Sequence, residues 1–423
     1  MDPRDLLLGS FSAAVAAADP LQIVPGHLPQ PPRGRTFVVG AGKAGGAMAL
    51  AVERHWPADA PLDGIVITRY GHAVPTQRIR IVEAGHPVPD ERGEAAARAI
   101  LEAARALGPD DLLLALVSGG GSSLLALPVD GVSMADLKAV TRDLLASGAP
   151  IQDMNTVRKH LSLIQGGRLA HATRARVLAL VISDVTGDDP THIASGPCTP
   201  DPSTFAESRE ILERFSVRPP PPVAAHLEAG AAGRIAETPK PGEAAFARAE
   251  NRVIATAQQS LAAAAAFVQA QGVTPMVLGD SVTGESSEVA KVFAAIARQL
   301  RLHGHPFAPP VAVISGGETT VTLRGTGRGG RCSEFLLSLA IEAAGLAETW
   351  ALACDTDGID GSEDNAGAVL TPNALARARS LGLDPKHMLA NNDGYNFFSA
   401  LGDLVVTGPT RTNVNDYRVI LVR

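Results

Sequence analysis

The stretch DLLLALVSGGGSS, residues 111–123, joins a short apolar run to a turn of glycine and serine. A continuous apolar run of this length, bounded by turn residues, predicts an inner strand of a parallel sheet, buried on both faces. Ligands of open α/β sheets bind just beyond the carboxyl ends of such strands. The turn offers hydroxyl donors and N–H groups that can converge on an anion, from Ser118, Gly119, Gly120, Gly121, Ser122 and Ser123. The stretch is therefore typical of a phosphate-binding turn, with an ordinary glycine turn as the alternative.

The same kind of junction recurs at residues 311–320, where VAVISGGETT again runs from an apolar strand into Ser-Gly-Gly. Its candidate phosphate-binding residues are Gly316, Gly317, Glu318 and Thr319. A third junction between a strand and a glycine turn occupies residues 36–46. Three such junctions predict a ligand site that is assembled from several strand ends.

The length and the alternation of patterns indicate an α/β protein of two domains. A chain of 423 residues exceeds the usual size of a single core. Apolar strands alternate with helical patterns along it, which predicts two Rossmann-like domains with mainly parallel sheets. The segment 216–243 is rich in proline, alanine and glycine and forms the best boundary. We therefore expect an N-terminal domain over residues 1–243 and a C-terminal domain over residues 244–423.

The charge and the cysteine content exclude several classes of partner. With 37 Lys and Arg against 44 Asp and Glu, the net charge of −7 gives no basic field for nucleic acid or an anionic membrane. No apolar run approaches the roughly 20 residues of a membrane-spanning helix. The three cysteines, Cys198, Cys332 and Cys354, lack metal-ligand spacing and fit a reduced compartment. We expect a cytoplasmic protein that binds neither nucleic acid nor membrane; a homodimer is compatible with the sequence, which does not decide the oligomeric state.

The glycine turn near the N-terminus satisfies the dinucleotide pattern G-x-G-x-x-G with Gly40, Gly42 and Gly45. A dinucleotide site also needs an acidic residue at the end of the second strand. That strand, GIVITRYG, ends in Thr68 and Arg69 without a carboxylate. NAD is therefore disfavoured, whereas Arg69 leaves the extra phosphate of NADP as an alternative.

Lys43 lies inside this glycine turn, just before a predicted helix. The turn is not a P-loop, because that motif would need glycine in place of Phe37 and serine or threonine in place of Ala44. A lysine at the N-terminus of a helix nevertheless stands where anions are favoured. We interpret Lys43 as an anion-binding residue, with a solvated surface lysine as the alternative.

Two aspartate clusters follow apolar strands and are candidates for Mg²⁺ ligands. The first contains Asp184, Asp188 and Asp189, and the reserve candidates are Asp355 and Asp357. Carboxylates at strand ends beside glycine loops commonly hold Mg²⁺ against phosphates. Aspartate is also a frequent turn residue, so ordinary turns remain the alternative.

Cationic side chains stand in two further segments. A helix capped by Asn155 or Thr156 would place Arg158 and Lys159 in its first turn, where a cation opposes the helix dipole and suggests a nearby anion. The glycine-rich segment 325–331 ends in Arg331 and has the composition of a flexible anion-binding loop or lid. Two solvated cations are an equal alternative for the first segment.

The motifs together resemble one family, the class II glycerate 2-kinases, which carry a C-terminal module called MOFRL. The resemblance covers about residues 36–417 in the same order and rests on VGAGKAGGAMA, GHPVPDERG, LVSGGGSSLLALP, MNTVRKHLSLIQGGRLA, VLALVISDVTGDDPTHIASGP, SGGETTV, GRGGRCSEFLLSLA, DTDGIDG and TGPTRTNVND. It implies two α/β domains with a cleft between them. It also implies ATP-dependent phosphorylation of the 2-hydroxyl of D-glycerate, with a divalent metal. The family's site lysine falls on Lys43 and its site arginine on Arg331.

Phosphoryl transfer fits the residues, because it depends on positioning and charge neutralisation more than on a nucleophile. Two other functions stay open at this point. Some members of the family carry the label hydroxypyruvate reductase, and an NADPH-dependent reductase would use the G-x-G-x-x-G turn and Arg69. A non-catalytic sensor of small anions would use the glycine loops without needing the aspartate clusters.

Overall fold

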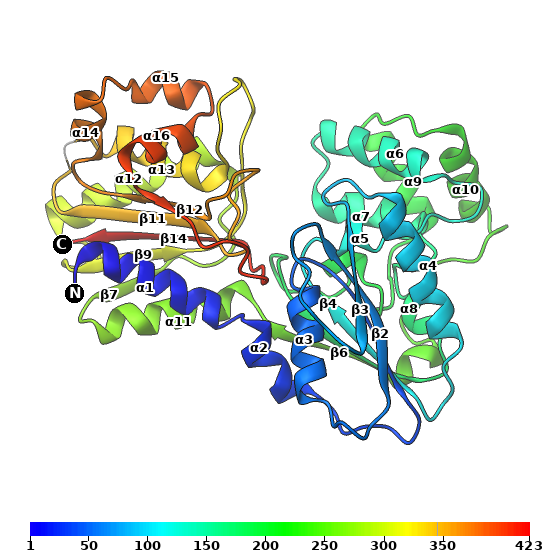
Figure 1. Ribbon diagram of the computed structural model, residues 1–423. Coiled ribbons are helices and arrows are strands. Elements are labelled where there is room, and N and C mark those ends of the chain that lie inside the picture. Colours follow the sequence, from blue (N-terminus) through cyan, green and yellow to red (C-terminus); the bar gives the residue numbers. More distant parts are fainter. Residues whose placement is uncertain (345) are drawn as a thin grey trace. The chain divides into compact units, whose positions relative to one another are not determined.

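The computed structural model describes residues 1–344 and 346–423 and divides into two compact units (Figure 1). The first unit is Pro20–Ile254. The second unit combines Met1–Asp19 with Ala255–Arg423. Each unit contains its own six-stranded sheet with helices packed against it.

The sheet of the first unit has the strand order β3-β2-β1-β4-β5-β6. Its strands are β1 (Thr36–Ala41), β2 (Leu62–Arg69), β3 (Ile79–Ala84), β4 (Leu112–Val117), β5 (Arg176–Ile182) and β6 (Ala249–Ala255). The pairings β1–β2, β1–β4, β2–β3 and β4–β5 are all parallel. β1 and β4 are buried along their whole length, as the apolar runs predict. The order of the strands reverses between these two, so the crevice at their carboxyl ends is the usual ligand position of this class.

The helices of the first unit include a group that lies away from the sheet, where α6, α7, α9 and α10 pack together (Figure 1). The helices are α2 (Pro20–Ile23), η1 (Val24–His27), α3 (Gly45–His55), α4 (Glu91–Arg105), α5 (Gly121–Leu124), α6 (Met134–Ala146), α7 (Ile151–His160), α8 (Arg168–His171), η2 (Ile193–Ser195), α9 (Phe205–Arg214), α10 (Pro221–Ala231) and η3 (Ala244–Arg248). α4 covers the sheet through Ile100 and Leu101, which share a core with Val39 and Leu113.

The sheet of the second unit has the order β13-β12-β11-β14-β9-β7. Its strands are β7 (Thr274–Val277), β9 (Val311–Ser315), β11 (Thr349–Asp355), β12 (Gly367–Leu370), β13 (Leu404–Val405) and β14 (Asp416–Val422), and a separate parallel pair is formed by β8 (Gly284–Glu285) and β10 (Thr319–Thr320). Only β7 and β9 pair in parallel in the larger sheet, and its other pairings are antiparallel.

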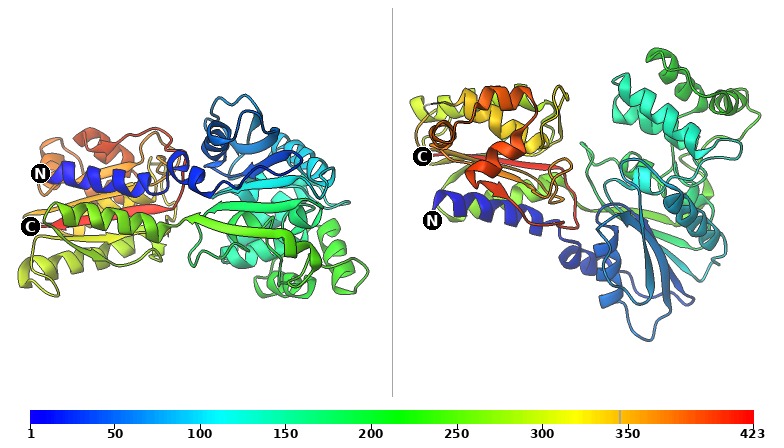
Figure 2. Two further views of the ribbon diagram at one scale, coloured as in Figure 1. Left: turned by 90° about the horizontal axis from the view of Figure 1, so that it is seen from below. Right: turned by 45° about the horizontal axis from the view of Figure 1, so that its top comes forward.

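Both faces of this second sheet are covered by helices (Figures 1 and 2). Val311 and Val313 face a core built with one group of helices, whereas Ala312 and Ile314 face a core built with α1 and α11. α1 and α11 lie side by side on that second face. The helices are α1 (Pro3–Ala16), α11 (Ala257–Ala270), α12 (Ser286–His303), α13 (Arg331–Glu342), α14 (Ala374–Ser380), α15 (Pro385–Ala390) and α16 (Gly394–Leu401).

The α/β class is confirmed, and the chain forms two units of that class. The mainly antiparallel pairing within the second sheet was not expected. A strand that is buried on both faces has a continuous apolar sequence whether it pairs in parallel or antiparallel, because its composition depends on burial alone. The direction follows here from the last strand, β14, which lies between β11 and β9 and is antiparallel to both.

The bounds of the units differ from the predicted domains 1–243 and 244–423. Residues 1–19 belong with the second unit, because Leu6, Leu7 and Phe11 of α1 are buried against α11 and the sheet. Residues 244–254 belong with the first unit, because β6 extends its sheet beside β5. Along the described residues, no single helix has the length and hydropathy of a membrane span; one bent pair, Pro3–Ala16 with Pro20–His27, passes that test jointly.

Candidate functional site

The turns that follow β1 and β4 are bonded to each other. The backbone N–H of Lys43 donates to the carbonyl oxygen of Gly119 at 2.8 Å. The next amide, that of Ala44, donates to Ser118 Oγ at 3.1 Å, and the Ser118 amide donates to the carbonyl oxygen of Ala41 at 3.2 Å. The two predicted junctions therefore form a single structure at the carboxyl ends of neighbouring strands.

The amides of the β1–α3 turn are occupied by the protein itself. In addition to the bonds of Lys43 and Ala44, the Gly42 N–H donates to Ile67 at 3.1 Å and the Gly45 N–H donates to Gly42 at 3.0 Å. Gly40 lies inside β1 and not in the turn. A dinucleotide site of the G-x-G-x-x-G type needs free amides and a close backbone approach at this point. The geometry of this turn does not supply them.

The β4–α5 turn differs, because several of its amides have no protein acceptor. Within the described chain, no acceptor lies at hydrogen-bond distance from the N–H groups of Gly119, Gly120, Ser122 and Ser123. Gly120 has φ +81°, a left-handed conformation that favours glycine. Backbone N–H groups without acceptors at a left-handed turn commonly form an anion-binding site.

Lys43 and His86 border this turn. A Cβ atom on Gly120 would lie 2.8 Å from His86 Nε2 and 3.4 Å from the Lys43 side chain. Burial and, next, the charges of Lys43 and Arg69 lower the pKa of His86 from 6.5 to about 3. The imidazole is therefore neutral near pH 7 and adds no charge to compete with Lys43 for an anion.

The hydroxyl groups of the predicted cradle are partly committed. Ser118 Oγ accepts the Ala44 amide, and Ser123 Oγ donates to the carbonyl oxygen of Gly120 at 3.1 Å. Ser122 Oγ lies 2.9 Å from Ser195 Oγ. Gly121 packs closely, since a Cβ there would lie 2.5 Å from that of Ala194. The serines thus shape the turn, and the free amides are its main remaining donors.

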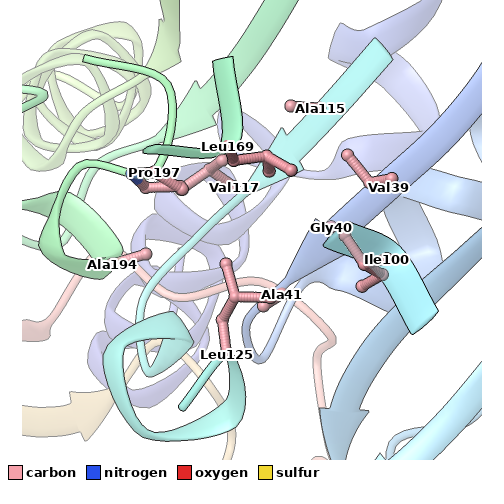
Figure 3. Close-up of a pocket in the computed structure, with 10 residues that line it drawn as sticks. All are labelled: Val39, Gly40, Ala41, Ile100, Ala115, Val117, Leu125, Leu169, Ala194 and Pro197. Carbon is pink, nitrogen blue, oxygen red and sulfur yellow. The ribbon is translucent and has the colours of Figure 1, made fainter. Parts of the chain in front are cut away.

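Beneath the turn the core closes tightly. A gap of about 10 Å³ is lined only by apolar groups and backbone from Val39, Gly40, Ala41, Ile100, Ala115, Val117, Leu125, Leu169, Ala194 and Pro197 (Figure 3). This volume is at the lower limit for one water molecule, and the lining offers no partner for water. A ligand at the turn must therefore bind on its outer side.

The three predicted metal ligands do not form a ready-made metal site. Asp184 and Asp188 are half-buried and Asp189 is exposed. Asp189 accepts the Thr191 amide at 2.8 Å, which is turn chemistry. No group of three Asp, Glu, His or Cys side chains that could hold a metal ion exists among residues 1–344 and 346–423. The aspartates, with Asp355 and Asp357, remain candidates for contacts with a metal that arrives on a ligand.

Arg331 is the first residue of α13 and lies at the centre of three carboxylates. Its Nε lies 2.6 Å from Asp416, its NH1 2.5 Å from Glu318 and its NH2 2.7 Å from Asp355. These charges outweigh the effect of burial and raise the pKa of the guanidinium well above its usual value. Arg418, which is fully buried, also pairs with Asp416. The expected mobile anion-binding arginine is therefore a fixed partner of acids in this structure.

The expected lid over residues 325–331 is also held in place. The amides of Arg324 and Gly325 donate to Asn392 Oδ1 at 2.7 and 3.1 Å, and the amide of Arg328 donates to Asp393 Oδ1 at 2.9 Å. The Arg328 side chain pairs with Glu363. Glycine composition predicted flexibility, but the residues that anchor the loop lie 35 to 68 positions later in the sequence.

The second Ser-Gly-Gly junction is more closed than the first. The Gly316 amide donates to Gly279 at 2.9 Å, and the buried Thr319 hydroxyl bonds Ser286 and Arg418. Gly317 has no room for a side chain, because a Cβ would lie 2.3 Å from the Val282 carbonyl oxygen. Of the four candidates, Glu318 alone is exposed, and it carries a carboxylate that bonds Arg331.

The cations of α7 occupy the other end of the helix from the one predicted. α7 begins at Ile151, after Pro150, so Arg158 and Lys159 lie in its last turn, where the dipole favours cations. Asn155 does not cap the helix but is buried within it, with its side chain bonded to His192 and Ser195. Asn155, Ser195 and Asp416 were missed as site residues. Asn155 lies inside α7 and Ser195 in η2, and Asp416 alone stands at the end of a strand, β14.

Two family models match the chain. A domain of unknown function, DUF4147, matches residues 6–228, and the MOFRL family matches residues 311–416. The second match confirms the MOFRL module that the sequence motifs indicated, within the second unit.

Named relatives cover nearly the whole chain. A protein of Agrobacterium vitis, provisionally named hydroxypyruvate reductase, is 53% identical over 99% of this chain and 94% of its own length. The D-glycerate 2-kinase of Thermotoga maritima is 37% identical over 99% of this chain and 98% of its own length. The glycerate 2-kinase of Pyrococcus horikoshii is 36% identical over 100% and 98%.

Solved structures agree with this match in fold. The crystal structure of a glycerate kinase from Thermotoga maritima superposes with a TM-score of 0.87 at 36% identity and covers 99% of both chains. A protein from Pyrococcus horikoshii superposes with a TM-score of 0.81 at 36% identity, over 100% of this chain and 99% of its own.

Proposed function

Since the chain belongs to the family that joins DUF4147 to MOFRL and includes the glycerate kinases, we propose that it phosphorylates D-glycerate with ATP. The reaction places the γ-phosphoryl group on the 2-hydroxyl and yields 2-phosphoglycerate and ADP. The chain is therefore a phosphotransferase that acts on a small hydroxy acid.

One observation carries the proposal: the glycine turn after β4 has amides without acceptors, and Lys43 lies beside it. Phosphoryl transfer is catalysed mainly by positioning and by neutralising charge on the transferred group. Preorganised N–H donors and a lysine at a strand end supply both effects. In this proposal Gly119, Gly120, Ser122 and Ser123 bind phosphate oxygens through their amides, and Lys43 contacts the transferred group.

Mg²⁺ is proposed to enter as part of the substrate Mg·ATP, because the described residues contain no preformed metal group. Carboxylate oxygens are its preferred protein ligands, and Asp184, Asp188 and Asp189 are the first candidates for such contacts. Asp355 and Asp357 are the reserve candidates. In the second unit, Arg331 holds Asp355 and Asp416 in position and is proposed to keep that acidic group ordered.

A hydroxypyruvate reductase is the second candidate, because two Agrobacterium vitis relatives at 53% and 52% identity are provisionally named so. NADPH would be its cofactor in this reading. The bonding of the β1–α3 turn argues against it, since the amides of Gly42, Lys43, Ala44 and Gly45 already have acceptors within the protein. A nucleotide pyrophosphate would have to break these bonds.

The two functions are separated by one paired assay. Purified protein is given D-glycerate with Mg·ATP and, separately, hydroxypyruvate with NADH or NADPH. We expect ADP to form in the first mixture and no cofactor oxidation in the second. Oxidation of NADPH without ADP formation would replace the kinase by the reductase.

A cytoplasmic location without nucleic-acid or membrane partners is part of the proposal and rests on the net charge of −7 and three buried, unpaired cysteines. A homodimer is also compatible with it. Sedimentation of the purified protein over a range of concentrations tests the oligomeric state.

A further inference from the structure

Arg158 carries a charge that no acidic side chain neutralises. Its guanidinium donates to Asn155 Oδ1 at 3.2 Å, and no carboxylate lies within 4.0 Å of it in the described parts of the chain. The Arg158 guanidinium is largely buried, and this burial alone lowers its pKa to about 10. A cation held in such a place without an anion is unfavourable unless a ligand compensates it.

Three other buried cations have carboxylate partners. Lys159, the next residue along α7, pairs with the buried Asp201 at 3.1 Å. Arg331 contacts three carboxylates, and Arg418 pairs with Asp416.

Arg168 also has no carboxylate within 4.0 Å among the described residues, but its NH1 donates to the carbonyl oxygens of Lys159 and Gln165 at 2.7 and 3.5 Å. The Arg158 guanidinium has the single hydrogen bond to Asn155, which leaves donors for a bound anion.

Arg158 is connected by contacts to the turn after β4. Its partner Asn155 is 2% exposed and also accepts a hydrogen bond from the Ser195 hydroxyl at 3.2 Å. Ser195 lies 2.9 Å from the Ser122 hydroxyl, which belongs to the proposed phosphate cradle. Arg158 is thus linked through Asn155 and Ser195 to a residue of the proposed cradle, and these contacts leave the amides of the cradle unused.

A second polar group at this place lacks a partner. The Nδ1 atom of His192 is buried and has no hydrogen-bond partner in the described chain. The carbonyl oxygen of the same residue accepts the Asn155 side-chain amide at 3.2 Å, and Asn155 accepts the Arg158 guanidinium, so His192 is linked to Arg158 through Asn155. The adjoining residues Ala194 and Ser195 have φ +50° and +58°, and such strained backbone is often kept at ligand sites.

We propose that Arg158 binds the carboxylate of the acceptor acid, with Asn155 orienting the guanidinium and His192 contributing a hydrogen bond. This inference rests on the proposed function for the identity of the acid. The planar fork of arginine matches a carboxylate through two parallel hydrogen bonds. Arg158 would then decide that the acceptor must be an acid and hold its 2-hydroxyl toward the cradle.

The test compares two acceptors in two proteins. D-Glycerate and its amide, glyceramide, differ in the charged group that Arg158 is proposed to contact. We expect wild type to prefer D-glycerate to glyceramide by about 10² in kcat/KM. Arg158→Gln should reduce this preference to about threefold or less. The KM of Mg·ATP should change less than about threefold in the variant. An equal loss for both acceptors would indicate a structural role and overturn the proposal, and so would a rise confined to the KM of Mg·ATP.

Two further variants keep the test decisive. Arg158→Lys keeps the positive charge but not the planar fork, so it should retain part of the preference for D-glycerate. This variant replaces Arg158→Gln in the test if Arg158→Gln does not fold. Arg168→Gln removes another half-buried arginine, one that donates to the carbonyl oxygen of Lys159, and should lower the melting temperature without changing the preference for the acid. A loss of the preference in Arg168→Gln as large as that in Arg158→Gln would contradict a specific contact.

Binding measured by calorimetry separates this inference from the proposed function. D-Glycerate and hydroxypyruvate both carry a carboxylate, so wild type should bind at least one of them and Arg158→Gln should bind that acid at least tenfold more weakly. If wild type forms no ADP but still shows this difference, the kinase fails and the carboxylate site stands. If ADP forms and the variant binds the acid as wild type does, the kinase stands and the site fails.

Discussion

The Lys43 amide donates to the Gly119 carbonyl oxygen across 2.8 Å and thereby joins the turns that follow β1 and β4. The lysine amide is thereby held beside a glycine turn in which the amides of Gly119, Gly120, Ser122 and Ser123 have no acceptor among the described residues. Both turns directly follow strands that are buried along their whole length. The core of the first unit therefore sets the position of the lysine backbone.

Gly120→Ala should abolish most activity, because the new methyl group would lie 2.8 Å from His86 Nε2 at a residue with φ +81°. Gly131→Ala is the matched control, since Gly131 has φ +84° with nothing within 4 Å of the added atom. Both variants carry about 1–2 kcal/mol of backbone strain. Thermal melts should show destabilisation in both variants, larger in Gly120→Ala because of the added contact with His86. Steady-state kinetics should show a loss of kcat/KM in Gly120→Ala alone. Equal activity in the two variants would remove the turn from the site.

Lys43→Ala should lower kcat/KM for D-glycerate phosphorylation by about 10²–10⁴, the range for losing an electrostatic donor to a transition state. The control is Lys291→Ala, which removes an exposed lysine paired with Glu288 on the surface of α12. That control should retain activity within a factor of two. A Lys43→Ala enzyme with more than a tenth of wild-type kcat/KM would show that less than about 1.4 kcal/mol is at stake and that the lysine is not part of the reaction.

Arg331→Ala should destabilise the second unit, because it leaves Asp355 and Asp416 without their shared partner. Removing one member of a buried charge network costs about 3–5 kcal/mol, or on the order of 10 °C in melting temperature. Arg328→Ala breaks an exposed pair with Glu363 and should change the melting temperature by less than about 2 °C, because solvent screens exposed ion pairs. Calorimetry of both variants measures the difference. Equal melting temperatures would mean that the Arg331 network is not structural.

The stability of the protein should depend on His86 below neutral pH. The folded pKa of about 3 lies below the usual 6.5, so between these values the unfolded chain holds a proton that the folded chain lacks. The free energy of unfolding therefore falls as the pH is lowered from 6.5 toward 3, and His86 contributes nothing to this dependence above 6.5. Urea titrations at pH 7.5 and 4.5 should show a smaller loss in His86→Gln than in wild type.

The difference between the two proteins should be at most about 2.7 kcal/mol, and less because the ring is partly exposed. His387→Gln is the control, since His387 is exposed on α15. The same loss in wild type and in His86→Gln would show that His86 takes up its proton in the folded state as readily as in the unfolded state.

Much of the first unit could be predicted from local sequence. The run that ends at Ser118 and the glycines after it predicted a buried strand and an anion-binding turn, because burial and turn chemistry depend on neighbouring residues. The strand is confirmed, and the anion site stays a prediction. The bounds of the units could not be predicted in the same way, because Leu6 and Phe11 pack in a core with residues about 250 or more positions later in the sequence.

The chemistry of Arg331 and Arg158 could not be read from spacing. Arg331 follows a glycine-rich segment, which suggested mobility, but its partners Asp355 and Asp416 come from two later strands. Arg158 was assigned to the first turn of a helix because Asn155 resembles a cap, whereas α7 begins four residues earlier. The partners that decide the role of Arg331 are distant in sequence, and only the fold brings them together. For Arg158 the position of the helix start decides which end of the dipole it meets.

Phosphorus NMR of the reaction product is the most direct measurement. Wild-type protein is incubated with Mg·ATP and D-glycerate, with the Lys43→Ala protein as control. Transfer to the 2-hydroxyl should give a new phosphomonoester signal split into a doublet by the single proton on C2, together with an equal amount of ADP. A triplet would place the phosphoryl group on the 3-hydroxyl, and no organic phosphate would contradict the kinase.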